Sequence, residues 1–405
     1  MFENIIGQAD VIQALRSELA QARFPRSSLF FGPAYSGKLS TALETARVLT
    51  CAAGTGDWSC ECPQCRLQKD LTHPQTVLIG PRYSDVEIAA SADALMRSRK
   101  PASRYLLLRA VRKLTRRFDP SIADADDARV KAMLGRVAQL EELLAELDPD
   151  TELPPASELG SLLEKIAAAA APIAAQVRGD MISIGQVRRL AAWTHLTAGE
   201  SRKVAIMENA DRMQDSARNA LLKMLEEPPA SVSLVLLTTR RAAIIPTILS
   251  RLRPYSFAAR SAAEETEVMA KIFRRESADF PGLRGFFLAW REINPEKLAH
   301  LARRFVELVQ APGEPGVDIV EEMADLLADR GARRGRSTRE TVSSFLEELA
   351  GHMRELFRAT GGDPDVLERW NEAAREAAAR IEGLNMSPSA VLEALFYRLR
   401  AEAAA

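Results

Sequence analysis

The chemistry of this chain begins at residues 32–39, whose sequence Gly-Pro-Ala-Tyr-Ser-Gly-Lys-Leu is close to a phosphate-binding loop. In the pattern G-x-x-x-x-G-K-[S/T], backbone N–H groups surround phosphate oxygens, the lysine reaches the outer phosphates and the hydroxyl holds magnesium. Gly32, Gly37 and Lys38 match this pattern, but Leu39 stands where the hydroxyl belongs. We therefore expect a vestigial phosphate site that lacks a metal ligand, and whether it binds ATP is an open question.

All four cysteines of the chain lie close together, at Cys51, Cys60, Cys62 and Cys65. In a reducing compartment such crowding favours a metal over disulfides. Four thiolates close a tetrahedral shell around zinc and leave no open position, so we expect a structural zinc site. The single residue between Cys60 and Cys62 is tighter than the usual spacing of roughly two to four residues. Reduced, unligated thiols are the alternative.

The composition sets limits on fold and location. The chain has 405 residues, of which 47% are apolar, enough for two or three domains with their own cores. Its formal net charge of −1 gives no general attraction for nucleic acid, so any DNA contact needs a local basic patch. The first residues lack the features of a signal peptide, and the apolar run 166–175 is too short to span a bilayer. We expect a soluble, cytoplasmic protein with no membrane partner.

The elements that position the phosphate loop and the cysteines follow an α/β pattern. Residues 1–260 alternate apolar runs with helical stretches, which is typical of a parallel sheet with helices on both faces. The expected strands are residues 29–31, 76–79, 203–207, 233–238 and 255–258. The expected helices include residues 38–49, 184–195 and 214–226. The glycine-rich loop thus follows a strand and opens a helix, as phosphate binding requires.

Residues 84–179 interrupt this alternation and predict a helical insertion in the form of a hairpin. Within the insertion, apolar residues spaced by three and four form a coiled-coil-like seam. The seam consists of Val130, Met133, Val137, Leu140, Leu144 and Leu147.

The insertion also separates its charges along the chain. Nine basic residues and no acidic one lie between positions 97 and 117, and Arg109, Arg112, Lys113 and Arg116 share one helical face. Residues 119–152 carry ten acidic residues against three basic ones. The basic face either binds nucleic acid or pairs with the acidic arm, and we favour the pairing.

Beyond residue 261 the strand signals end, and amphipathic helices follow one another, separated by Pro and Gly pairs. This pattern predicts an all-helical C-terminal part. We expect a helical lid at residues 261–310 and a helical collar domain at residues 311–405.

The segment 219–229, Asn-Ala-Leu-Leu-Lys-Met-Leu-Glu-Glu-Pro-Pro, resembles the core of bacterial DNA polymerase III clamp-loader subunits, a branch of the AAA+ family. Further resemblances are the opening residues 2–8, the four-cysteine module, His73-Pro74, Thr238-Thr239 and Leu249-Ser250-Arg251. The resemblance covers residues 1–83 and 180–260, is faint in the C-terminal part and is absent from the insertion. It implies a P-loop AAA+ domain followed by the lid and collar.

In the ATPase members of this family an apolar strand ends in Asp-Glu, where Asp helps to hold the metal and Glu activates water. Here the strand at residues 204–207 runs into Glu208-Asn209. Asn209 cannot take up a proton, and loss of a general base typically costs about 10²- to 10⁴-fold in rate. Together with Leu39 this favours the non-hydrolysing delta-prime branch over the gamma/tau motors. We place Glu208, Asn209 and Thr239 in the degenerate nucleotide site.

Arg251 belongs to a Ser-Arg pair that resembles the family's Ser-Arg-Cys motif, with Leu252 in place of Cys. The resemblance implies that Arg251 reaches the ATP of a neighbouring subunit. An arginine supplied in trans stabilises the transferring phosphoryl group, with effects of about 10³ to 10⁵ in rate. A surface arginine in a salt bridge, worth roughly 0–1 kcal/mol, is the alternative.

These features predict a clamp-loader subunit that does not hydrolyse ATP by itself and that presents Arg251 to an adjacent ATPase subunit. The expected partners are subunits of the gamma/tau and delta types and, through the complex, the sliding clamp and primer–template DNA. One alternative is an active gamma/tau-like motor. Another is a binding module in which residues 104–117 contact DNA directly.

Overall fold

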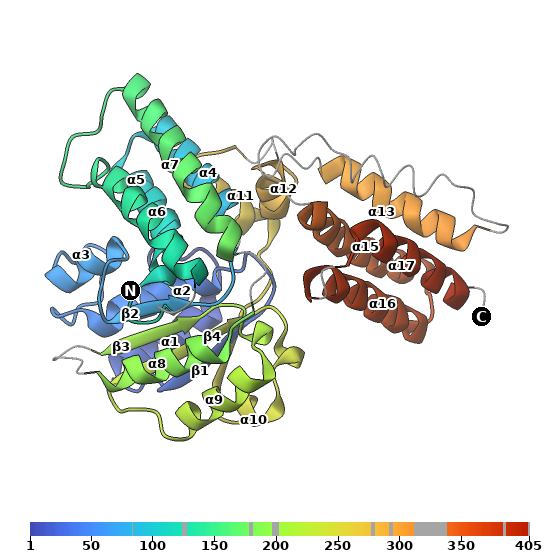
Figure 1. The fold of residues 1–405 in the computed structure, drawn as a ribbon, viewed down its shortest axis with the longest axis horizontal. Helices are drawn as coiled ribbons and strands as arrows, with labels where there is room; N and C mark the ends of the chain where they lie inside the picture. The colour runs from blue at the N-terminus through green and yellow to red at the C-terminus, as the bar shows by residue number, and fades with distance from the viewer. Residues whose placement is uncertain are drawn as a thin grey trace. The chain divides into compact units, whose positions relative to one another are not determined.

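The computed structural model describes residues 1–82, 84–123, 128–177, 181–196, 202–276, 280–290, 295–311, 338–383 and 386–403 (Figure 1). The chain separates into two compact units, Met1–Phe287 and Leu288–Ala405. Among the helices of the described ranges, none has both the length and the apolar character to cross a membrane.

The first unit is built on a five-stranded parallel sheet in the order β2-β3-β4-β1-β5. The strands are β1 (Ser27–Phe31), β2 (Thr76–Ile79), β3 (Lys203–Met207), β4 (Val232–Thr238) and β5 (Arg253–Ser256). The first four strands are buried along nearly their whole length, as expected where helices cover both faces. The predicted parallel sheet is confirmed, and its last strand lies two residues earlier than predicted.

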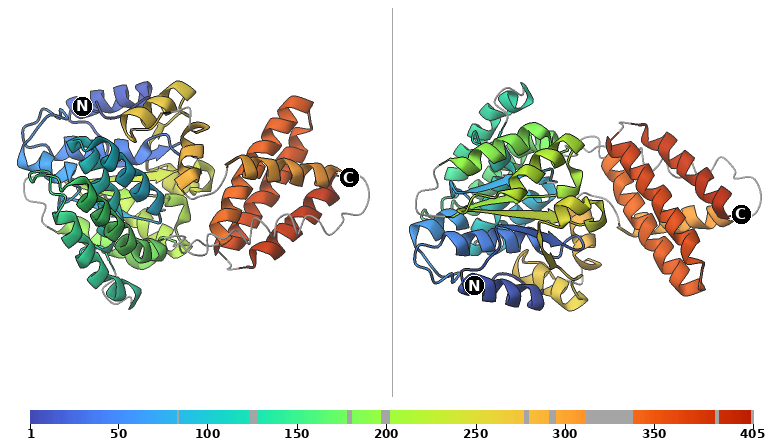
Figure 2. Two further views of the ribbon diagram at one scale, coloured as in Figure 1. Left: turned by 90° about the horizontal axis from the view of Figure 1, so that it is seen from above. Right: turned by 90° about the horizontal axis from the view of Figure 1, so that it is seen from below.

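Two pairs of helices cover the sheet. Helices α1 (Ala9–Ala20) and α2 (Lys38–Thr50) lie on one face, and α8 (Ile184–His195) and α9 (Asp215–Glu226) lie on the other (Figure 2). Leu29 and Phe30 are neighbours in β1 and pack into opposite apolar clusters, because successive strand residues point to opposite faces. The start of α8 is fixed by a capping box between Ser183 and Gln186.

The insertion between β2 and α8 is larger than the predicted hairpin. It contains α4 (Asp85–Ser98), α5 (Pro101–Thr115), the short 3₁₀ helix η1 (Arg116–Phe118), α6 (Ala128–Ala145) and α7 (Ala156–Val177). These helices share one apolar core, so we call α4–α7 the bundle. Leu140, Leu144 and Leu147 are completely buried in that core, and the other residues of the predicted seam pack against it. A hairpin would have left the apolar faces of α4 and α5 exposed.

The described residues of the second unit form helices and no strand. Its helices include α13 (Pro295–Gln310), α15 (Thr338–Thr360), α16 (Pro364–Gly383) and α17 (Pro388–Ala403), and a single apolar cluster joins them. Before it come α11 (Ala262–Lys271) and α12 (Gly282–Trp290). The predicted boundaries at residues 260 and 310 stay predictions. The contacts of the chain divide it at Phe287, and α13 packs against α15 and α17.

Candidate nucleotide and metal sites

The glycine-rich loop connects β1 to α2, and its backbone requires glycine at two positions. Gly32 has φ 146°, and a Cβ there would lie 2.2 Å from the carbonyl oxygen of Phe257. Gly37 precedes α2 with φ 92°, a conformation that residues with side chains rarely adopt. The loop thus leads into a helix N-terminus, where backbone N–H groups attract anions.

Lys38 is folded into the loop that it would otherwise use to bind phosphate. Its Nζ donates to the carbonyl oxygens of Gly32 at 2.8 Å and Pro33 at 2.5 Å, and to Ser36 Oγ at 3.2 Å. Burial, followed by the positive charge of Arg260, lowers the pKa of Lys38 to about 8. The ammonium group therefore already has acceptors without a phosphate.

Arg260 covers the same loop, a contact that the sequence did not predict. Its guanidinium group donates to the carbonyl oxygens of Tyr35 and, at 3.2 Å, Ile6. A Cβ on Gly37 would lie only 2.8 Å from Arg260 Nη2. The ring of Tyr35 also stacks on Phe287 of α12, with centroids 5.2 Å apart. Side chains that follow β5 and lie on α12 therefore close over the phosphate loop.

Leu39, which replaces the expected hydroxyl residue, lies in apolar surroundings. Leu39 packs against the cluster formed by α1, α2 and the sheet. Ser40, the next hydroxyl along the chain, is exposed on α2. One step along a helix turns a side chain by about 100°, so Ser40 does not replace the lost ligand.

The acidic motif follows β3, and its carboxylate is already paired with two arginine side chains. One carboxylate oxygen of Glu208 accepts from Arg82, and the other accepts from Arg117. Asn209 adopts a left-handed conformation, and its Nδ2 donates to the carbonyl oxygen of Pro81 at 2.8 Å. Neither side chain is therefore available as a free metal ligand or base. Arg82 and Arg117 were not recognised from the sequence, because no local pattern links them to Glu208.

Arg251 lies in the turn after α10 (Pro246–Leu249), with 35% of its side chain exposed. Its Nη1 donates to the carbonyl oxygen of Thr247 at 2.8 Å, and its Nη2 lies 2.9 Å from Glu226 Oε1. Thr239 is exposed at the carboxyl end of β4. The roles of Arg251 and Thr239 stay predictions.

The four cysteines converge on one point beside α3 (Pro63–Lys69). Their sulfur atoms all lie within 4.8 Å of one another, and those of Cys51 and Cys60 are 3.7 Å apart. Tetrahedral zinc with Zn–S bonds of about 2.3 Å places sulfurs about 3.8 Å apart, whereas a disulfide requires about 2.05 Å. The geometry fits a metal with four thiolate ligands, and the short Cys60–Cys62 spacing does not prevent it.

The surroundings of the sulfurs shift the pKa values of Cys62 and Cys65 in opposite directions. Burial alone would raise the pKa of Cys62, but backbone N–H groups, including that of Cys65, outweigh it and lower the pKa to about 6. Burial raises the pKa of Cys65, opposed by Arg47, whose Nη1 donates to its sulfur at 3.3 Å. A zinc ion with four thiolates would carry two negative charges, and Arg47, which also forms a buried ion pair with Glu44, would donate to one of the sulfurs.

The basic face of α5 is used inside the protein. Arg109 donates to the carbonyl oxygens of Gln68 and Lys69, Arg112 to that of Asp70, and Arg116 to those of His73 and Thr76. The predicted pairing with the acidic arm is present where Arg112 Nε lies 3.4 Å from Glu141 Oε2. Most of these contacts, however, go to the backbone from the end of α3 to the start of β2. The basic face is therefore half-buried, which disfavours direct DNA binding by residues 104–117.

The sequence model of a family described as "DNA polymerase III, delta subunit" matches residues 7–118 and 158–261, more than half of the chain. The chain belongs to this family. The match includes α4, α5 and most of α7, which the resemblance seen in the sequence had left out, and within the insertion it leaves residues 119–157 unmatched. The phosphate loop, the cysteines and the acidic motif all lie inside the matched ranges.

One curated protein and one solved structure are similar to parts of this chain. The chain is 36% identical over 99 residues to "DNA polymerase III subunit delta'" of Pseudomonas aeruginosa, covering 24% of this chain and 30% of that protein. A crystal structure of a DNA polymerase III gamma subunit-related protein from Thermotoga maritima is 19% identical, with a TM-score of 0.28. The aligned region covers 55% of this chain and 80% of the Thermotoga maritima chain. A TM-score this low establishes no common arrangement, so the fold is described from this chain alone.

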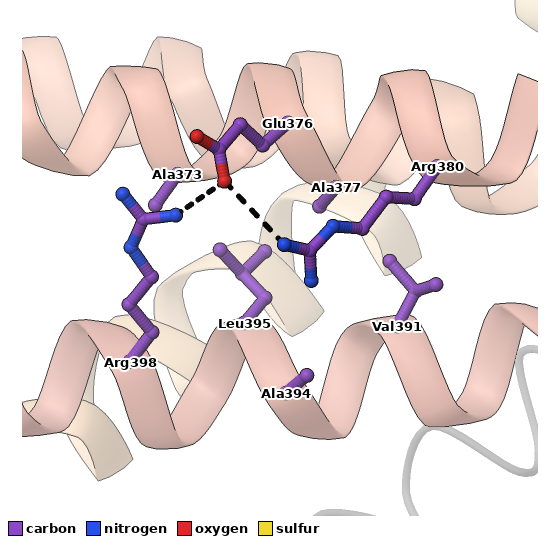
Figure 3. A pocket seen from close by; sticks show the side chains of 8 residues that line it. All are labelled: Ala373, Glu376, Ala377, Arg380, Val391, Ala394, Leu395 and Arg398. Carbon is purple, nitrogen blue, oxygen red and sulfur yellow. Dashed lines mark hydrogen bonds and ion pairs between the residues drawn. The ribbon is translucent and has the colours of Figure 1, made fainter. Parts of the chain in front are cut away.

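This family member also has a small pocket in its second unit, between α16 and α17 (Figure 3). Its lining consists of Ala373, Glu376, Ala377, Arg380, Val391, Ala394, Leu395 and Arg398. Glu376 lies 2.5 Å from Arg398 and 3.7 Å from Arg380, so its charged groups satisfy one another. None of the residues predicted for nucleotide, metal or partner binding lines this pocket.

Proposed function

We propose that this chain is a subunit of the replicative clamp loader that does not hydrolyse ATP. It supplies Arg251 to the nucleotide of a neighbouring ATPase subunit while the sliding clamp is loaded on primed DNA. The family membership and the similarity to a curated delta' subunit support this assignment. Its partners are then subunits of the gamma/tau and delta types.

The state of the acidic motif carries the proposal. A hydrolysing site needs a carboxylate free to hold the metal and a base to activate water. Glu208 is paired with two arginines, Asn209 has no carboxylate, and Leu39 offers no metal ligand. Loss of several such groups at one site leaves no route to efficient turnover.

Zinc in this proposal has a structural role. Cys51, Cys60, Cys62 and Cys65 would hold it with no position open for water or substrate, so it supplies folding energy and no chemistry of its own. Within the first unit it would fix the segment between α2 and α3.

Steady-state ATP hydrolysis by the purified chain, alone and in the reassembled loader, tests the proposal. We expect no turnover above background from the chain alone. In the loader, Arg251→Ala should reduce turnover at the adjacent site by at least about 10²-fold, since an arginine in trans contributes about 10³ to 10⁵. Arg253→Ala is the matched control, because Arg253 is an exposed arginine outside the Ser-Arg pair and should leave the rate within about twofold.

The gamma/tau-like motor is the competing function. Turnover by the isolated chain that disappears with Lys38→Ala would establish it and reject the proposal. An assembled loader whose rate is unaffected by Arg251→Ala would remove the trans role of Arg251 while leaving the absence of hydrolysis intact.

A further inference from the structure

A network of five charged side chains connects the bundle to the acidic motif. Arg82 contacts both Glu208 and Glu87 of α4, the latter at 2.5 Å between Nη2 and Oε2. Lys113 of α5 pairs with the other oxygen of Glu87, and Arg117 of η1 pairs with Glu208. Side-chain exposure falls to 8% for Glu208 and 5% for Arg117. The network is therefore shielded from water, where charge–charge forces are strong.

The network contains three cations and two carboxylates, so it has a net positive charge. Burial would raise the pKa of Glu87, but the charges of Arg82 and Lys113 lower it to about 2. Glu87 is thus ionised at neutral pH and saturated by its own partners. A divalent cation that approached Glu208 would meet two arginines and no free carboxylate oxygen.

Arg117 is committed to Glu208. Its Nε and Nη1 are buried without a hydrogen-bond partner among the described residues, so Glu208 provides its charge compensation. Rotation away from Glu208 would leave a buried, uncompensated guanidinium, which is strongly unfavourable.

The bundle fixes the arginine in this position. Arg117 lies in η1, which directly follows α5, and Arg109 and Arg112 of α5 bind the backbone after the cysteine module. Arg116, its neighbour in η1, binds the carbonyl oxygens of His73 and Thr76 at 3.0 Å each. The end of α5 is thus attached to β2, which pairs with β3, the strand that Glu208 directly follows.

We propose that the bundle, through Arg117 and together with Arg82, keeps Glu208 closed to divalent metal ions. This lock rests on the proposed absence of hydrolysis and adds a separate cause to it. Leu39 and Asn209 remove a ligand and a base, whereas the two arginines neutralise the ligand that is left. A nucleotide site repaired at Leu39 in the phosphate loop and at Asn209 in the acidic motif therefore remains unable to use a metal.

The test measures ATP affinity by isothermal titration with Mn²⁺ and with EDTA, in a repaired background of Leu39→Thr and Asn209→Glu. With both arginines present, Mn²⁺ should change the affinity less than threefold. With Arg82→Gln and Arg117→Gln added, Mn²⁺ should tighten ATP binding at least tenfold, because Glu208 is then free. Lys113→Met is the matched control: it removes a network cation that does not contact Glu208 and should give no gain.

A tenfold gain from Mn²⁺ in the repaired chain with both arginines would overturn the lock, as would no gain in a folded chain without them. Circular dichroism and zinc content report folding. If the double arginine change prevents folding, Arg117→Gln is tested alone. It frees one oxygen of Glu208, so Mn²⁺ should tighten ATP binding at least threefold. A folded Arg117→Gln variant without this gain would also overturn the lock. Hydrolysis by the unmodified chain is measured separately and bears on the proposed function, not on this comparison.

Discussion

Single residues determine what the degenerate site and the cysteine cluster can do. At position 39 a leucine packs into the apolar cluster beside α2, and at position 209 an amide binds a backbone carbonyl. Both side chains have acquired contacts of their own within the fold. Restoring a hydroxyl at position 39 would also remove apolar contacts, so repair of the site is expected to lower stability.

The cysteine cluster gives the first prediction. Cys65→Ala removes the one fully buried ligand, so bound zinc should fall from about one per chain to less than about 0.2, with a lower melting temperature. Metal analysis after gel filtration measures this. Arg66→Ala is the control, since its exposed side chain pairs only with exposed Glu61 in the described structure and should leave zinc bound. Full zinc content in Cys65→Ala would contradict a four-thiolate site.

His73 gives a pH-dependent prediction. Burial, followed by the charge of Arg116, lowers the pKa of His73 to about 4. The Nδ1 atom of His73 accepts a hydrogen bond from the backbone N–H of Gln75 at 3.1 Å. Because the unfolded imidazole has a pKa near 6.5, protonation favours unfolding as the pH falls from about 6.5 toward 4. The free energy of unfolding should drop by about 2 kcal/mol between pH 7 and 4.5 through His73 alone.

Urea denaturation of the native chain and of His73→Gln at both pH values isolates this effect. Loss of zinc at low pH affects both proteins, so the difference between their pH dependences belongs to His73. The variant should be less stable at pH 7 and show a flatter dependence on pH. Equal dependences in the two proteins would rule out a buried neutral His73.

At the scale of elements, the bundle combines local helices into a core that the sequence revealed only in part. The heptad-like spacing of α6 predicted its buried stripe, since that signal lies within one helix. The packing of the four helices α4–α7 depends on which helix faces meet. A short stretch of sequence does not specify these contacts. For the same reason Leu39 and Asn209 could be interpreted from local motifs, whereas Arg117 and Glu208, 91 residues apart, could not be paired.

The bundle core gives a prediction with an internal control. Leu144 is fully buried in α6, and Leu144→Ala should lower the stability of the first unit by about 2–5 kcal/mol. Leu134 lies on the same helix with 42% of its surface exposed, so Leu134→Ala should change stability by about 0.5 kcal/mol or less. Chemical denaturation, with hydrogen exchange in α5–α7 as the probe of unfolding, measures the stability change of both variants. Similar effects of the two changes would contradict the described core.

At the scale of the whole molecule, the two units have separate apolar cores. The second unit is centred on residues such as Phe345 and Trp370, and the sheet of the first unit on residues such as Leu43. Sequence periodicity predicted the helical character of the second unit, because each helix has its own apolar stripe. The division at Phe287 depends on which core takes up each helix, which composition and breaker residues do not specify.

Separate cores predict separate responses to mutation. Phe345→Ala should cost about 3–5 kcal/mol, since Phe345 is fully buried and contacts Phe305 edge-on at 5.7 Å. Hydrogen exchange measured by mass spectrometry should then show faster exchange in α13–α17 and unchanged protection in β1–β4. The reciprocal change is Leu43→Ala, because Leu43 is 2% exposed in the apolar cluster that packs against the sheet. It should speed exchange in β1–β4 and leave the protection of α13–α17 unchanged. Equal loss of protection in both units from either change would mean that they unfold as one cooperative structure, because a free-energy change then spreads over every element that unfolds with it.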